Sequence, residues 1–433
     1  MSLRVEGSGI LDTHVEWSDV ESRLQKAFKT KATLGPNKTV VHVGEGNGFL
    51  SRIGLIECDW QGAGKDDSLP KRIALKMASC LSFKTFEAST PEEEMMENRD
   101  EILGSFEYFV IKTHNMECTV YSFLEKFSEG LAMPKRYYSV PFSDDNTLAG
   151  QLCLEYVDNS KICHIHEEMT VEQMKQIARL LGKIQARSSV HEVKKVKQIA
   201  ENDVFTDFFS KMPIEIFYTM AKALGSLDPS EEMSKHLETL TSIYKEYYGS
   251  NLPCTLHEQL GFEPVLVHGD LWAANIMFDA DTNNVKAIVD WQLSHLGNGI
   301  EDLLRISFAG LLTKTRRAHF NEFIDEMYDS MTENLEGHKA PYTREQLEDA
   351  YHLLFVHAAL FFIPIAVPIF RVLAHLKEID DEERKKRVEV VLDKVRGIIE
   401  DMSEFHDEFK KSGRQFKWRS DSFPMPANIE VSQ

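Results

Sequence analysis

The stretch VLVHGDLWAANIMF, residues 265–278, places an acid and an amide between two apolar runs, at a spacing that suits phosphoryl transfer. Asp270 precedes Asn275 by five residues. Phosphotransferase catalytic loops use this separation, with the Asp accepting the proton of the acceptor hydroxyl and the Asn binding magnesium. His268, Asp270 and Asn275 could equally cap helices and close turns, so the pattern leaves a structural interpretation open until other parts of such a site are found.

A second candidate metal ligand follows the loop by twenty residues. Asp290 ends the apolar run VKAIVDW, so we expect its carboxylate to emerge at the end of a strand beside Asn275. Carboxylate and amide oxygens suit a hard divalent cation. Asp270, Asn275 and Asp290 are therefore the predicted catalytic residues, with Asn275 and Asp290 as the magnesium ligands.

The run RIALKMA, residues 72–78, has the alternation of a strand and supplies a candidate for phosphate binding. Ala74 and Lys76 share one face of it, as in the V-A-I-K strand of nucleotide-binding lobes, where the lysine pairs with phosphates and the small residue admits adenine. The alternative is an edge-strand lysine that reaches water. The strand alone does not decide between these interpretations.

A buried lysine needs a carboxylate partner, and the helix expected over residues 106–127 offers one. Glu117 lies on the apolar face of this helix, where an unpaired carboxylate would be costly. We predict that Glu117 pairs with Lys76. Glu97 and Glu101, in a more polar run, are the alternatives.

A glycine-rich stretch precedes the lysine strand. Gly44, Gly46 and Gly48 stand between two strand-like runs, where backbone N–H groups could approach phosphates closely. The spacing is GxGxG, which departs from GxGxxG, and a plain hairpin turn is the alternative. The order of the parts supports a phosphate loop, because glycine turn, lysine strand, glutamate helix, HxDxxxxN and metal Asp follow one another as in the protein-kinase fold.

Composition bounds the possible partners. The chain has 433 residues and a formal charge of −20, which argues against nucleic acid or an anionic membrane as the main partner. Six scattered cysteines and an N-terminus without an apolar signal core favour a cytoplasmic setting. The apolar segment 353–370 contains Pro364 and Pro368, so we expect a buried helix that ends near Pro364 rather than a membrane span.

The distribution of patterns predicts two lobes of an α+β protein. Short alternating runs dominate up to residue 157, and helical periodicity dominates from residue 170 onward. We expect a small β-rich nucleotide-binding lobe over residues 1–157, with its core at about 40–157. A larger helical lobe over residues 158–433 would carry the catalytic loop and the substrate site, with a polar hinge at residues 158–162 and a loose tail from about residue 418.

Departures from the protein-kinase pattern favour a small acceptor. Gly269 stands where protein kinases carry the Arg of HRD, and Trp272 stands where they usually carry Lys. Asp302 follows Asp290 by only twelve positions, which leaves no room for an activation segment closed by APE. A peptide would therefore lack its docking platform, and Trp272 either packs the loop or contacts the acceptor.

The segments LVHGDLWAANIMF, IVDWQLSHLGNGIEDLLR and LCLEYVDN resemble the choline kinase-like and aminoglycoside phosphotransferase superfamily, in particular its ecdysteroid kinase-like group with uncharacterised nematode and insect members. The resemblance covers roughly residues 40 to 400. It implies a bilobal protein-kinase-like fold, and magnesium-dependent transfer of the ATP γ-phosphate to a hydroxyl of a small molecule.

By position, the resemblance also implies roles for residues outside the loop. Asp302 would brace the catalytic loop by hydrogen bonding, although an ordinary first-turn helix carboxylate is an equal alternative. The backbone around Glu155, Tyr156 and Val157 would bind adenine. The resemblance repeats the assignments of Asp270 as base and of Lys76 with Glu117 as the phosphate-positioning pair.

Three questions stay open in the sequence. The segment CHIHEE, Cys163 to Glu168, gathers possible zinc ligands but has no second cluster at zinc spacing. The acceptor could be a choline-like cationic alcohol, which suits the acidic charge, or a steroid or other apolar alcohol, which suits Phe355, Phe361 and Phe362. The alternative to an active kinase is a catalytically silent module that binds a nucleotide or a ligand.

Overall fold

A computed structural model of the chain describes residues 2–43, 50–65, 68–81, 99–203, 214, 218, 224–225, 228–375 and 379–414. Within these ranges it gives the backbone alone for 99–103, 105 and 364–375. The chain forms two compact units. Unit 1 comprises Met1–Ser128, Met133–Ser160 and Ala287–Gln292, and unit 2 comprises Glu129–Ala132, Lys161–Lys286 and Leu293–Gln433. The single division expected between residues 157 and 158 is thus too simple, because residues 287–292 join unit 1.

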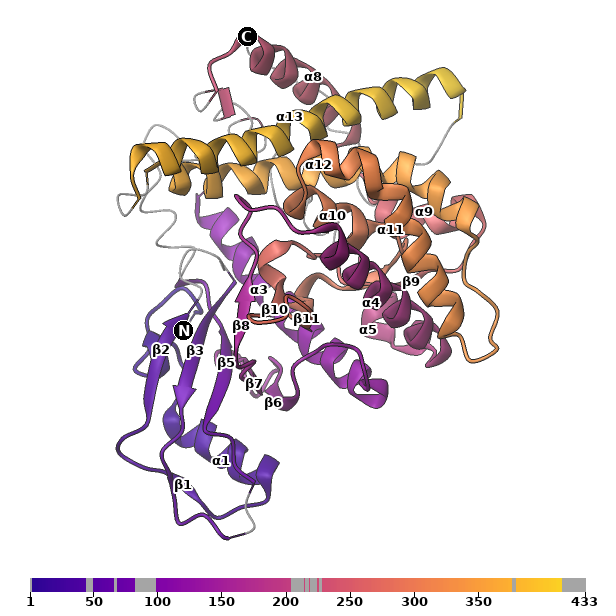
Figure 1. Cartoon of the computed structure of the whole chain (residues 1–433). Helices are drawn as coiled ribbons and strands as arrows, with labels where there is room; N and C mark the ends of the chain where they lie inside the picture. Colours follow the sequence, from indigo (N-terminus) through magenta and orange to yellow (C-terminus); the bar gives the residue numbers. More distant parts are fainter. Residues whose placement is uncertain are drawn as a thin grey trace. The chain divides into compact units, whose positions relative to one another are not determined.

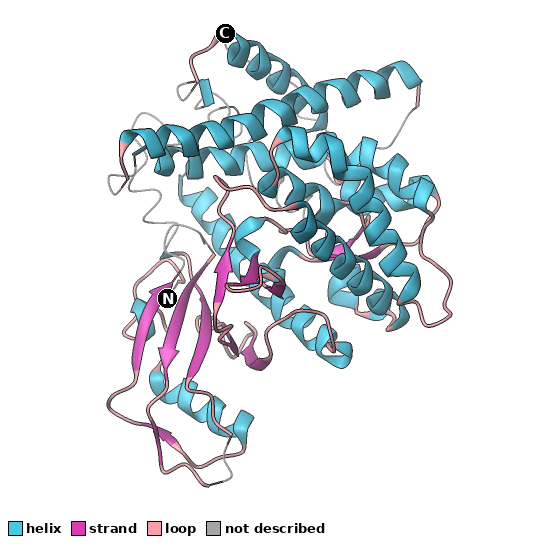
Figure 2. Cartoon of the chain, in the orientation of Figure 1, coloured by secondary structure: helices cyan, strands magenta, loops and turns pink. Residues whose placement is uncertain are grey.

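Unit 1 is built on a five-stranded antiparallel sheet in the order β2-β3-β5-β7-β6 (Figures 1 and 2). Its strands are β2 Thr39–Val43, β3 Ser51–Glu57, β5 Arg72–Ala78, β6 Arg136–Val140 and β7 Gln151–Glu155. The strands β1 Thr33–Leu34 and β4 Trp60–Gln61 form a separate antiparallel pair in the same unit. The central position of β5 makes Lys76 a residue of an inner strand.

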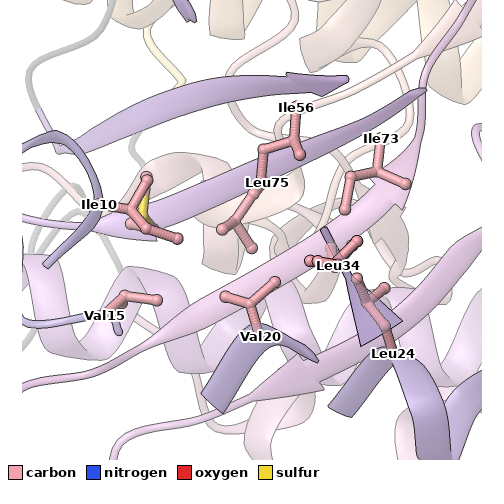
Figure 3. Close-up of a cluster of buried hydrophobic side chains, with 10 residues drawn as sticks. Ile10, Val15, Val20, Leu24, Leu34, Ile56, Ile73 and Leu75 are labelled. Carbon is pink, nitrogen blue, oxygen red and sulfur yellow. The ribbon is translucent and has the colours of Figure 1, made fainter. Parts of the chain in front are cut away.

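Helices cover both faces of this sheet. The face that carries Ile73, Leu75 and Met77 packs against α1 (Trp17–Phe28), and Figure 3 shows the resulting cluster. Residues before the predicted core supply half of its ten buried members: Ile10, Val15, Val20, Leu24 and Leu34. The expected core of about 40–157 was therefore too short, because α1 and the segment before it close one face of the sheet.

The other face of the sheet meets α3 (Arg99–Leu124), the helix predicted over residues 106–127. Ala78 of β5 and Val110 of α3 share a second buried cluster, which also contains Phe142. Strand alternation thus sends apolar residues of β5 towards α1 and its small and basic residues towards α3. This places Lys76 on the side from which a residue of α3 can reach it.

Unit 2 is mainly helical. Its helices are α4 Val171–Val190, α5 Lys197–Ala200, α8 Glu231–Tyr247, α9 Leu252–Leu260, α10 Glu301–Gly310, α11 Thr313–Glu333, α12 Arg344–His375 and α13 Asp381–Ser412 (Figure 1). Helix α4 starts at a capping box, in which the Thr170 side chain and Gln173 satisfy each other's backbone N–H groups. The α+β class predicted from the sequence is confirmed, with an antiparallel sheet first and a mostly helical part after it.

Short strands flank the predicted catalytic loop and the residues around Asp290. Strand β9 (Val265–Val267) pairs antiparallel with β12 (His295–Gly297) inside unit 2, and β10 covers Ile276–Asp279. Strands β8 (Ser160–Ile162) and β11 (Val285–Ile288) each have residues in both units. The predicted polar hinge at 158–162 is therefore a turn only at its start, where Asn159 has a φ of 45°, and continues as β8.

The expectation that a helix ends near Pro364 was wrong, because α12 continues through Pro364 and Pro368 to His375. A proline inside a helix frees the carbonyl four residues earlier. For Pro364 that carbonyl belongs to Leu360, and the Tyr244 hydroxyl of α8 donates a hydrogen bond to it. This external donor lowers the cost of keeping the proline in the helix. None of the described helical segments is long and apolar enough to cross a bilayer.

Candidate active site

A buried charge cluster in unit 1 brings together three predicted site residues. The Nζ of Lys76, on β5, lies 2.7 Å from Oε2 of Glu117 on α3 and 2.5 Å from Oδ1 of Asp290, which follows β11. The pair that was predicted from strand and helix periodicity is therefore present in the structure. Glu97 lies outside the described residues, and so does the side chain of Glu101.

Among the described side chains, the cluster holds one ammonium and two carboxylates, so these groups are one positive charge short of balance. Burial and the negative charge of Asp290 raise the pKa of Glu117 to about 7, in spite of the opposing effect of Lys76. Burial also disfavours the charged form of Lys76, but the two carboxylates outweigh it and raise the pKa of the ammonium. A further cation at Asp290 would relieve this imbalance.

Asp290 has an unusual backbone conformation and a partly exposed side chain. Its φ is 72°, in the left-handed region that few residues other than glycine occupy, although Asp tolerates it better than most. About a quarter of its side chain, 26%, is exposed, whereas Glu117 is 1% exposed. The carboxylate of Asp290 is thus the accessible member of the cluster.

The predicted catalytic loop lies in unit 2, directly after β9. Asp302, on the first turn of α10, accepts hydrogen bonds from the backbone N–H groups of His268 at 2.7 Å and Gly269 at 3.0 Å. Asp302 is buried, and burial together with the charge of Glu301 raises its pKa to about 6, against the effect of the two N–H groups. Asp302 thus holds the backbone of the loop, rather than serving as an ordinary exposed first-turn carboxylate.

Gly269 occupies the position of the kinase arginine for a steric reason. Its φ is 80°, and a Cβ built on it would lie 2.2 Å from the carbonyl oxygen of Leu293. No side chain fits there without movement of the backbone. The absent arginine is therefore a consequence of how closely residues 269 and 293 pack.

The remaining loop residues have distinct surroundings. The amide nitrogen of Asn275 donates to the backbone carbonyl of Asp270 at 2.8 Å, so its amide oxygen is the atom that could bind a metal. His268 is buried, and its Nδ1 accepts from the N–H of Asp270 at 3.2 Å. Trp272 is half-buried, and its backbone N–H bonds to the carbonyl of Asp270 at 3.1 Å.

The expected adenine-binding segment follows β7 in unit 1. The N–H of Glu155 donates to the carbonyl of Lys135 at 2.7 Å, and the carbonyl of Val157 accepts from the Ser160 hydroxyl at 2.7 Å. The residues connecting β2 to β3 include Gly44, Gly46 and Gly48, which lie outside the described residues. The phosphate-loop prediction therefore stays a prediction.

The sequence did not reveal a second buried charge cluster, which lies behind the loop in unit 2. His295 of β12 lies 3.1 Å from one oxygen of Glu301, and Arg305 donates to the other oxygen at 3.0 Å. All three side chains are buried. Spacing within IEDLLR could have indicated the Glu301 and Arg305 pair, which are four apart on one helix, but nothing local points to His295.

A family model described as "Uncharacterized oxidoreductase dhs-27", DUF1679, matches residues 3–410. The chain belongs to the DUF1679 family. It is 24% identical to the "Uncharacterized oxidoreductase dhs-27" of Caenorhabditis elegans over 351 residues, which are 78% of this chain and 40% of that protein. It is also 24% identical to the "Uncharacterized kinase-like protein D1044.1" of the same organism over 282 residues, covering 63% of this chain and 71% of that one.

Solved structures of small-molecule kinases are similar to this DUF1679 chain. A choline kinase from Streptococcus pneumoniae matches with a TM-score of 0.33 and 12% identity, covering 88% of this chain and 98% of its own. A GDP complex of a mutant aminoglycoside 2'-phosphotransferase-IIIa matches with a TM-score of 0.41 and 10% identity, covering 92% and 99%. The sequence resemblance to kinase-like proteins is confirmed at the level of the family.

The family is named after dhs-27, a protein called an uncharacterized oxidoreductase, and the match to this DUF1679 chain spans 40% of that protein. Nucleotide-dependent oxidoreductases commonly bind their cofactor on a parallel sheet. The five-stranded sheet of unit 1 is antiparallel throughout. The described architecture therefore gives that name no support in this chain.

Other candidate sites in this DUF1679 chain are weaker. Among the described residues, the one group with three possible ligand atoms within 4.8 Å of one another is Glu232, His236 and Glu400, so the segment Cys163 to Glu168 does not form such a group. Arg317 already holds Glu400 at 2.6 Å, which disfavours a cation there. All six cysteines are free thiols.

The aromatic run that suggested an apolar acceptor belongs to the core of unit 2. The Phe355 ring of α12 packs 4.9 Å from Phe308 of α10 and 4.9 Å from Phe405 of α13, between ring centroids. Phe361 and Phe362 are also buried. These rings hold helices together, so they give no argument for a steroid acceptor.

Proposed function

We propose that this protein is an ATP- and magnesium-dependent phosphotransferase that moves the γ-phosphate to a hydroxyl of a small molecule. The observation that carries the proposal is the buried contact between Lys76 and Glu117, 2.7 Å long, with Asp290 2.5 Å from the same ammonium. Phosphotransferases need a lysine fixed by a helix glutamate to position phosphates, and a nearby aspartate to bind magnesium. A core ion pair placed only for stability would not need a third, partly exposed carboxylate.

Each member of the proposed site has one task. Asp270 is the base that receives the proton of the acceptor hydroxyl, and Asn275 and Asp290 are the magnesium ligands. Their carboxylate and amide oxygens fit magnesium, and the unit 1 cluster lacks one positive charge. When bound, magnesium would neutralise charge on the phosphates. Lys76 orients the phosphates, and Asp302 keeps the loop backbone in place.

The nucleotide base would lie against β7 and the residues after it. Because the N–H of Glu155 and the carbonyl of Val157 already have partners, adenine would contact the carbonyl of Glu155 and the N–H of Val157. Ala74, on the neighbouring strand β5, leaves room for a flat ring. The glycine stretch at 44–48 would cover the phosphates.

A small acceptor is favoured over a protein. Only residues 291–300 separate Asp290 from the start of α10 at Glu301, too few for a peptide-docking segment. Because residue 269 is Gly, the chain also lacks the arginine whose positive charge would pair with a phosphorylated activation loop. Because the aromatic run is core, the acidic charge becomes the stronger guide, and cationic alcohols are the first acceptors to test.

The test is transfer of labelled phosphate from ATP to two panels of alcohols, one cationic and one apolar. We expect Asp270→Asn to reduce turnover about a thousandfold or more, because it removes the proton acceptor. Asp281→Asn is the matched control, since Asp281 is an exposed aspartate on the turn after β10. Turnover that is equal in Asp270→Asn and wild type would contradict the proposed base.

The same experiment separates the proposal from a silent binding module. A silent module would gain thermal stability with ATP and magnesium, yet transfer no phosphate to either panel. Transfer that needs Asp270 rejects that alternative. Thermal unfolding of each variant without ligand shows whether a loss of turnover is a loss of folding.

A further inference from the structure

The ring of His295 faces a hydrogen-bond acceptor at each nitrogen. Its Nδ1 lies 3.0 Å from the carbonyl oxygen of Leu293, and its Nε2 lies 3.1 Å from a carboxylate oxygen of Glu301. A backbone carbonyl accepts only, and so does an ionised carboxylate. Both ring nitrogens must therefore carry protons to make both bonds, and the side chain is fully buried.

The charges around His295 balance when the ring is an imidazolium. Glu301 lies between His295 and Arg305, and Asp302 is the next residue of α10. Among the described residues, two cations then face two anions, while burial lowers the pKa of the neighbouring His357 to about 4 and keeps it neutral. His268 is a further histidine next to this cluster, because its backbone N–H donates a hydrogen bond to Asp302.

His295 also stands next to the predicted catalytic loop. In the β9 and β12 pair it lies opposite Val267, the residue before His268. The Leu293 carbonyl that it holds is the atom that lies against Gly269, 2.2 Å from where a Cβ would be. Ser294, between them, donates to the carbonyl of His268 at 3.3 Å.

We propose that His295 is a positioning residue that, as a buried imidazolium, ties residues 293–295 to Glu301 and so fixes the backbone on which Asp270 is carried. Its positive charge also offsets Glu301 and keeps Asp302 ionised, so that Asp302 can accept both loop N–H groups. This proposal rests on the proposed function for its effect on turnover, but not for the charge of the ring.

The charge of the ring is tested without any activity. In the full chain labelled with ¹⁵N-histidine, we expect both ring nitrogens of His295 to give imidazolium shifts at pH 7.5, with the signal assigned by its loss in His295→Gln. Burial opposes this form, but Glu301 outweighs burial and raises the pKa of His295. A ring with one unprotonated nitrogen at that pH would overturn the proposal.

The positioning role is tested by turnover as a function of pH. In His295→Gln we expect kcat to fall about tenfold with an unchanged KM for ATP, and the acid limb of the profile to move up by about one pH unit, because Asp302 becomes harder to ionise. Adding Glu301→Gln removes the uncompensated charge, so the double variant should move the limb back.

The matched control is His319→Gln, which breaks a His and Glu contact of 2.8 Å at the surface of α11. It should leave kcat and the pH profile unchanged. A His295→Gln protein with the wild-type profile, or a double variant whose acid limb stays where the single variant put it, would overturn the positioning role. If no variant transfers phosphate, the proposed function fails while the NMR result still decides the charge of His295.

Discussion

Glu117 and Glu301 are both buried to the same extent, 1% exposed, yet their pKa values shift in opposite directions. Burial raises the pKa of Glu117 to about 7, because it shares the single ammonium of Lys76 with Asp290. Burial also opposes ionisation of Glu301, but His295 and Arg305 outweigh it and lower the pKa to about 2. The number of cations around each carboxylate decides the sign.

This difference in charge separates the cluster that is proposed to bind ligands, in unit 1, from the cluster that stabilises the loop, in unit 2. Among the described side chains, the unit 1 cluster is short of positive charge and has an accessible member, Asp290, which the proposed function assigns to a cation. In the unit 2 cluster the charges of the described residues balance and the side chains are buried, and Asp302 accepts hydrogen bonds from two backbone N–H groups of the loop. Variants of the second should therefore damage folding, whereas variants of the first should damage binding more than folding.

The largest effect on stability is expected for Glu301→Ala. It leaves His295 and Arg305 as buried cations without their partner, and removing one member of a buried charge pair costs about 3–5 kcal/mol. Urea unfolding monitored by circular dichroism measures the change. Glu322→Ala, which removes a surface glutamate paired with His319 and Lys175, should cost far less. Equal losses in the two variants would mean that the buried cluster is not structural.

Gly269→Ala should come next, because it breaks the contact between the loop and residue 293. We expect a loss of about 2–4 kcal/mol from the left-handed φ and the clash with the Leu293 carbonyl. Gly337→Ala is the matched control, since Gly337 has a φ of 82° with no atom within 4 Å of an added Cβ. The difference between the two variants isolates the packing of the loop.

The pH dependence of stability should show opposite slopes for the two glutamates. Glu117 binds its proton more tightly in the folded protein, so its contribution falls as the pH rises from 4.5 to about 7. Glu301 binds its proton less tightly, so its contribution is present above 4.5 and is lost as the pH falls towards 2. Comparing wild type with Glu117→Gln and Glu301→Gln across pH measures both slopes, and slopes of the same sign would refute the comparison.

The smallest loss of stability is expected for a change that involves no charged group. Tyr244→Phe removes the hydroxyl that donates to the Leu360 carbonyl, so we expect a loss of about 1 kcal/mol. Ser234→Ala, which removes an exposed hydroxyl bound to Ser230 in α8, is its control. A Tyr244→Phe loss no larger than that of the control would show that the proline-freed carbonyl finds another donor.

The parts that could be predicted from the sequence are those with a local period. Strand alternation placed Lys76, and helix periodicity placed Glu117 on the face that meets it. The brace by Asp302 followed only from the resemblance. For Lys76 and Glu117, a short segment carries enough information about which way the side chain points.

The parts that could not be predicted depend on contacts between distant segments. His295 is recognisable only once β12 is paired with β9, and the course of α12 through Pro364 depends on a hydroxyl from α8. Tertiary contacts, not local preference, decide these two features. Helix α1 is a different case, because its buried residues Val20 and Leu24 stand four apart, which is a local signal for a helix.

The central claim is that the charge-deficient cluster of Lys76, Glu117 and Asp290 binds nucleotide phosphates through magnesium. Calorimetric titration with ATP, once with magnesium and once with EDTA, tests it most directly in wild type, Asp290→Asn and Asp281→Asn. We predict at least about tenfold tighter binding with magnesium in wild type and Asp281→Asn, and no gain in Asp290→Asn. The same gain from magnesium in all three proteins would contradict the account.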